Sequence, residues 1–129
     1  MNIEKIKDEC ETMQANLECV IPDGINEVID HAKMIAVFHA RTGYMLAQAK
    51  LIVRSKKTSE IGDTIVKIAK ENFLSAKAQN ALVDSIAADE MFIVDWLDRL
   101  NSMCVHQIDL MRSIISKEKE ELRIVKSGY

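Results

Sequence analysis

Residues 91–114 read MFIVDWLDRLNSMCVHQIDLMRSI, and their apolar side chains recur at the spacing of an α-helix. Steps between seam positions alternate between four and three residues, the heptad pattern of coiled-coil-like helices. This pattern predicts one helix over residues 89–126, about 55 Å long at 1.5 Å per residue. Because that length exceeds the diameter of a compact domain of this size, we expect part of the helix to pack on another chain or project into water. The seam positions are Ile93, Leu97, Leu100, Cys104, Gln107, Met111 and Ile114.

A second long helix is predicted over residues 24–55, since the only proline, Pro22, precedes it. Small residues form one stripe on this helix, and small side chains let a neighbouring helix approach closely. A second apolar stripe lies about half a turn away. Two apolar surfaces on one helix favour a homo-oligomer. The small stripe comprises Ala32, Ala36, Ala40, Gly43 and Ala47, and the other comprises Met34, Phe38, Met45 and Ile52.

Three shorter helices are expected over residues 2–19, 59–71 and 75–87. The first carries an apolar seam from Ile3 to Val20, while Ser75 caps the third and Phe73 and Leu74 fill the corner before it. One proline and four glycines are too few for the turns of a many-stranded β fold. We therefore predict an all-α fold with one domain over residues 1–129, an elongated bundle of long coiled-coil-like helices that self-associates.

Composition indicates a cytoplasmic protein that does not enter a membrane. The N-terminus is charged from its fourth residue, and no apolar run approaches the roughly 18 to 20 residues of a membrane span. Cys10, Cys19 and Cys104 form no CxxC motif and are expected to be buried thiols of a reducing compartment.

The sequence predicts no enzyme, no metal and no cofactor. Phosphate-binding glycine motifs and nucleophile elbows are absent. Cys104 and His106 project about 160° apart on a helix, so they form no nucleophile and base pair. His31 and His39 are interpreted as polar edges of a packed helix.

Lys50, Arg54, Lys56 and Lys57 form the candidate nucleic-acid-binding site. Residues 31–59 contain six basic side chains and no acidic one, and clustered cations bind backbone phosphates through counterion release. The alternative is that these cations pair with the acidic first helix, which would leave no free site. Tyr44 is expected to be buried in the bundle, with stacking on a base as its other possible role. The acids of the first helix are Glu4, Asp8, Glu9, Glu11 and Glu18.

IAKENFLSAKAQNAL, residues 68–82, resembles the helix-turn-helix unit of bacterial repressors. The resemblance departs from that unit at Phe73, where glycine is preferred, and at Gln79, where a branched apolar residue is usual. A plain helical corner is the alternative interpretation.

Two long segments, INEVIDHAKMIAVFHARTGYMLAQAK (25–50) and MFIVDWLDRLNSMCVHQIDLMRSI (91–114), give a helix order that resembles the phage recombination mediators of the UvsY family. The resemblance covers about half of the chain and implies an oligomeric, all-helical protein that binds single-stranded DNA and assists a recombination protein. The competing hypothesis is a helical adaptor or scaffold that docks a protein on Met34, Phe38 and Met45.

Overall fold

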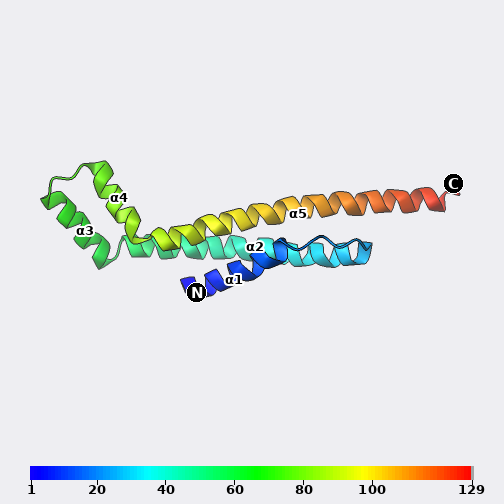
Figure 1. Cartoon of the computed structure of the whole chain (residues 1–129), viewed down its shortest axis with the longest axis horizontal. Helices are drawn as coiled ribbons and strands as arrows, with labels where there is room; N and C mark the ends of the chain where they lie inside the picture. The colour runs from blue at the N-terminus through cyan, green and yellow to red at the C-terminus, as the bar shows by residue number, and fades with distance from the viewer. Residues whose placement is uncertain (129) are drawn as a thin grey trace.

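The computed structural model describes residues 1–128, and Tyr129 of the predicted domain lies outside them. Among the described residues there are five helices and no strand, which confirms the all-α prediction (Figure 1). Helix bounds differ from the predicted ranges by at most two residues. The helices are α1 (Ile3–Leu17), α2 (Ile25–Lys57), α3 (Glu60–Glu71), α4 (Ala76–Ile86) and α5 (Ala88–Lys126).

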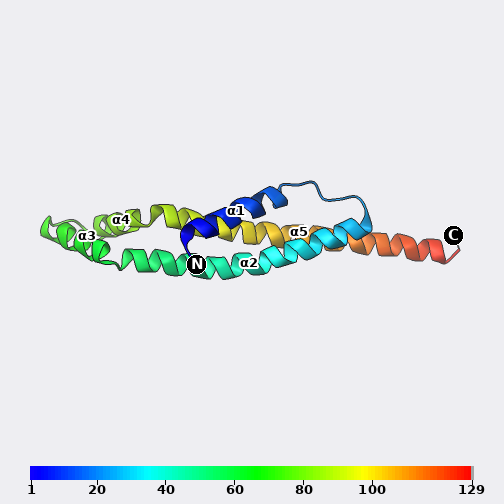
Figure 2. The ribbon, with the colours of Figure 1, turned by 90° about the horizontal axis from the view of Figure 1, so that it is seen from below.

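The two long helices, α2 and α5, lie side by side in opposite directions (Figures 1 and 2). Their contact face contains Ile35 and Met45 from α2 and Leu97, Leu100 and Met111 from α5, all fully buried. On α5 the buried and half-buried positions include every member of the predicted heptad seam. Full burial of a leucine, isoleucine or methionine side chain contributes about 1.5 to 3 kcal/mol.

A polar contact lies within this apolar interface. The amide of Asn101 donates to Thr42 Oγ1 at 2.9 Å and to the His39 carbonyl at 3.3 Å, while the Thr42 hydroxyl donates to the same carbonyl at 2.9 Å. Thr42 is fully buried. Sliding α5 along α2 would leave these polar groups unpaired, so the contact sets the register of the pair.

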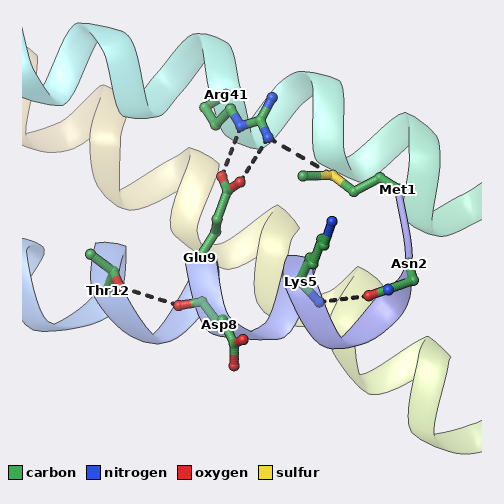
Figure 3. Close-up of polar contacts among 7 residues, drawn as sticks. All are labelled: Met1, Asn2, Lys5, Asp8, Glu9, Thr12 and Arg41. Atoms are coloured by element: carbon green, nitrogen blue, oxygen red, sulfur yellow. Dashed lines mark hydrogen bonds and ion pairs between the residues drawn. The ribbon is translucent and has the colours of Figure 1, made fainter.

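Helix α1 packs on α2 and α5 through Ile6, Cys10, Met13 and Leu17. Trp96 Nε1 donates to Gln14 Oε1 at 3.0 Å, and Gln107 Nε2 donates to the Leu17 carbonyl at 2.6 Å. At the N-terminal end of α1, the Asn2 side chain accepts a hydrogen bond from the Lys5 backbone amide (Figure 3). The expectation that Val20 continues the seam is wrong because α1 ends at Leu17.

The three cysteines differ in their exposure to solvent. Cys10 and Cys104 are buried, and burial raises the pKa of the Cys10 thiol to about 11. Cys19 is exposed in the segment between α1 and α2, so the prediction of a buried thiol is wrong at this position.

Apart from Ala32, which is half-buried, the small-residue stripe of α2 does not face a helix of this chain. Ala36, Ala40, Gly43 and Ala47 are exposed, and a Cβ added to Gly43 would meet no atom within 4 Å. The reason is that α5 occupies the opposite side of α2. Because Ala36 and Ala40 are exposed, these two positions do not line a close helix contact within the chain.

The proposed docking stripe of the adaptor hypothesis belongs to the core. Met45 is fully buried, and Met34 and Phe38 pack partly buried against the same cluster. Most of the surface of this stripe is therefore covered by the chain itself, and only parts of Met34 and Phe38 face outward.

At one end of the molecule, α5 extends past the start of α2 (Figures 1 and 2). Leu122, Ile124 and Val125 are exposed in this extension, as expected for a helix longer than its neighbours. Among the described residues, no helix has the length and apolar character needed to cross a bilayer.

At the other end, α3 and α4 form a hairpin beyond α2 (Figure 1). Gly62 allows the close approach of α3 to α2, because a Cβ at this position would collide with the Lys57 carbonyl oxygen. Ser75 caps α4 as predicted, accepting a hydrogen bond from the Ala78 amide at 3.2 Å. Ile68 and Leu74 are exposed, which favours the plain helical corner over a packed helix-turn-helix unit.

Phe73 does not fill the corner between α3 and α4, contrary to expectation. Its side chain is 95% exposed and its backbone is left-handed, with φ of 57°. The Phe73 amide donates to the Lys70 carbonyl and the Leu74 amide to the Ala69 carbonyl, both at 3.1 Å. This is the Schellman arrangement, in which the left-handed position is usually glycine.

Replacing Phe73 by glycine is predicted to stabilise the fold by about 0.5 to 1 kcal/mol. The left-handed backbone costs an L-residue about 1 to 2 kcal/mol, and glycine's greater freedom in the unfolded chain offsets part of the gain. Urea unfolding followed by circular dichroism measures the difference. Phe73→Ala is the control, since it removes the ring but keeps the strained backbone. Equal stability of the two variants would contradict this explanation.

Candidate nucleic-acid interface

Three of the four predicted residues line one groove. Lys50, Arg54 and Lys57 follow one another at spacings of four and three, so they project from the same side of α2. With Thr58 they form the rim of an open groove of about 410 Å³, whose floor is apolar. The floor consists of Val53 from α2 and Met91 and Val94 from α5.

The fourth residue, Lys56, does not line this groove. Its ammonium lies 2.6 Å from Oε1 of Glu90, which is largely buried at the start of α5. The hydrogen bond from Lys56 lowers the pKa of the Glu90 carboxyl, and burial acts in the opposite direction. Lys57 also pairs within the chain, 2.9 Å from the exposed Asp84 carboxylate. The predicted cluster of four therefore contains two ion-paired lysines.

The alternative that helix α1 pairs with the basic stretch holds for Arg41 and not for Lys56 or Lys57. The acids that pair with Lys56 and Lys57 belong to α5 and α4. Helix α1 instead pairs with Arg41, whose guanidinium makes two hydrogen bonds of 2.7 and 2.8 Å to Glu9 (Figure 3). These bonds lower the pKa of Glu9. Arg41 and Lys50 project about 180° apart on α2, so α1 covers the side away from the groove.

Three cations of α2 make no ion pair with any residue in the described range 1–128, namely Lys33, Lys50 and Arg54. They share the outward face of α2 with Tyr44 and Leu51, and all five lie within about 120° of one another at 100° per residue. Tyr44 is 53% exposed, so its expected burial is wrong. The Arg41 guanidinium lies 5.3 Å from the Tyr44 ring centroid.

This outward face was not predicted from the sequence. Lys33, Val37, Ala40, Tyr44, Ala47, Leu51 and Arg54 follow one another at spacings of 4, 3, 4, 3, 4 and 3. The same spacing is found on buried helix faces and on exposed ones, so it does not show which kind this face is. Only the position of α5 on the opposite side of α2 distinguishes the two.

The groove has the composition of a surface that can bind a ligand. Within residues 1–128, no three His, Cys, Asp or Glu side chains gather in a way that would hold a metal ion. An apolar floor rimmed by cations can hold the ring of a base or an apolar side chain beside an anionic group. The chain matches no family model, no curated protein and no solved structure. The resemblance to the UvsY family thus continues to rest on helix order and on residues 25–50 and 91–114.

Removal of the Lys56 ammonium is predicted to destabilise the fold near neutral pH. Lys56→Met leaves the buried Glu90 carboxylate without its partner, at a cost of about 1 to 2 kcal/mol for this half-exposed pair. Because the pKa of Glu90 is lower in the folded state, the stabilisation is present above its ordinary value of 4.5 and is lost as pH falls through the folded-state pKa.

Urea titrations at pH 7 and pH 3 test this prediction. The difference in the free energy of unfolding between the parent and Lys56→Met should be smaller at pH 3 than at pH 7. Lys57→Met is the matched control, because its partner Asp84 is exposed and the pair should contribute little. Equal stability of the parent and Lys56→Met at pH 7 would show that the pair has no structural role.

Proposed function

We propose that this chain is a non-enzymatic accessory protein that binds single-stranded DNA along the outward face of α2 and works as a homo-oligomer. One observation carries the proposal: unpaired Lys33, Lys50 and Arg54 share an exposed helix face with Tyr44. Cations bind the phosphates of a single strand, while an exposed aromatic ring stacks on its bases.

The charge pattern of α2 supports this assignment. Residues 31–59 contain no acidic side chain, so no carboxylate of this helix segment repels a phosphate backbone that follows it. Lys50 and Arg54 lie between the apolar groove and the Tyr44 face. A strand that crosses them has apolar surface for its bases on both sides.

Recombination or replication is the proposed setting, on the strength of the resemblance to the UvsY family. In that setting a recombination protein would be a further partner. Several weak sites in one homo-oligomer would bind one strand with an affinity above that of a single site. The adaptor hypothesis is less well supported, since the stripe assigned to it packs against the core.

Fluorescence anisotropy with a labelled oligothymidine tests DNA binding. We expect Lys50→Gln/Arg54→Gln to weaken binding and to reduce the slope of log affinity against log salt by about 1.4, or about 0.7 for each phosphate that is no longer neutralised. Lys56→Gln is the control for removal of positive charge, because Glu90 already holds that ammonium, and it should keep the parent slope. Absence of binding by the parent at low salt would refute the proposal.

Tyr44→Ala provides a second, independent measurement. Stacking of one base on an aromatic ring is worth about 1 to 3 kcal/mol, so affinity should fall about 5- to 150-fold while the salt slope stays unchanged. Because Tyr44 is half-exposed, the melting temperature should change little. If Tyr44→Ala binds as tightly as the parent, Tyr44 is not part of the DNA-binding site.

A further inference from the structure

Lys57 is a cation of the groove whose ammonium is bound to a carboxylate of the α3–α4 hairpin. It lines the groove together with Lys50 and Arg54, and the three positions span about 10 Å along α2 at 1.5 Å per residue. Lys57 Nζ lies 2.9 Å from Oδ1 of Asp84 on α4. Among residues 1–128, Lys50 and Arg54 form no ion pair. One carboxylate of the hairpin thus neutralises a third of the positive charge around the groove.

The Asp84 carboxylate can give up this lysine at low cost. Its side chain is 66% exposed, so water solvates the carboxylate once the ammonium has left, and an exposed ion pair stabilises a fold little. Helix α4 has no buried residue among those described, so close packing does not fix Asp84 in place. A lysine ammonium has donors only and binds a phosphate oxygen as it binds a carboxylate oxygen. A phosphate can therefore take the place of Asp84.

The neighbouring lysine shows what prevents such an exchange. Lys56 binds Glu90, whose side chain is only 11% exposed. Departure of Lys56 would leave a largely buried carboxylate without a partner, which is much more costly than exposing one that is already in water. Lys56 therefore stays on Glu90, whereas Lys57 is free to change partners.

The other acidic side chains near the groove do not hold its cations. Asp95 and Asp98 of α5 are exposed and line a separate hollow with Arg99 and Ser102. Neither forms an ion pair with any residue in the range 1–128. Asp84 is thus the carboxylate that competes with a bound phosphate for a cation of the groove.

We propose that Lys57 is an additional phosphate contact, which a bound single strand takes over from Asp84. The inference rests on the proposed binding of single-stranded DNA and adds a residue and a built-in competitor to the same site. When the strand binds, the Lys57 ammonium moves from the Asp84 carboxylate to a phosphate, and α4 loses its ion pair with α2. Because the strand must first break this pair, Asp84 lowers its affinity by about 1.4- to 5-fold.

Fluorescence anisotropy with labelled oligothymidine over a range of salt concentrations tests whether Lys57 contacts a phosphate. We expect Lys57→Gln to reduce the slope of log affinity against log salt by about 0.7, the value for one phosphate contact on a single strand. Lys56→Gln removes the same charge one residue away and should keep the parent slope. Circular dichroism checks that both variants stay helical. A parent slope for Lys57→Gln would overturn the proposal.

A double-mutant cycle tests the role of Asp84. Asp84→Asn should raise the affinity for oligothymidine by about 1.4- to 5-fold, because the strand no longer has to break the ion pair. In the Lys57→Gln background the same substitution should have little effect, since the pair is already absent. An equal rise in both backgrounds would mean that Asp84 acts only through its long-range charge, and it would overturn the exchange.

The same titrations separate this inference from the proposed function. A parent protein that does not bind oligothymidine at low salt refutes both. If the parent binds and Lys50→Gln/Arg54→Gln lowers the salt slope while Lys57→Gln does not, the proposed function holds and only the exchange of Lys57 is overturned.

Discussion

Antiparallel packing of α2 on α5 is the contact on which the rest of the structure depends. It fully buries large apolar side chains from both helices, among them Ile35, Met45, Leu97 and Leu100. The Thr42 and Asn101 side chains set its register by a buried hydrogen bond. Helix α1 packs on the side of this pair from which Arg41 projects. The groove lined by Lys50, Arg54 and Lys57 also depends on this pair, because its floor combines Val53 of α2 with Met91 and Val94 of α5.

This packing also divides the cations of α2 by role. Arg41 is held by Glu9, Lys56 by Glu90 and Lys57 by Asp84, which joins α2 to α1, α5 and α4 in turn. Lys33, Lys50 and Arg54 remain on the outward face. A stretch of basic residues that appears uniform in the sequence thus contains structural ion pairs and free charges, and only the free ones can bind a polyanion without breaking a pair.

The two ends of the molecule extend past the core formed by the long helices. At one end, α5 continues beyond α2 with Leu122 and Val125 exposed, and at the other the α3–α4 hairpin buries little more than Gly62 and Ala69. The chain therefore has too few contacts to cover its own apolar surface at either end.

Local periodicity determined the elements of this protein, because a helix is specified by spacing, caps and breakers that lie within a few residues of one another. The seam of α5, the break at Pro22 and the cap at Ser75 were all predictable in this way. Which side of α2 is covered was not, since this helix is apolar on several faces and the sequence alone ranks none of them. Placement of α5 put Met45 inside and Tyr44, Ala40 and Gly43 outside, contrary to expectation. The partners of Lys56 and Lys57 likewise depend on residues about 30 positions away, so their ion pairs follow from tertiary contacts and not from local spacing.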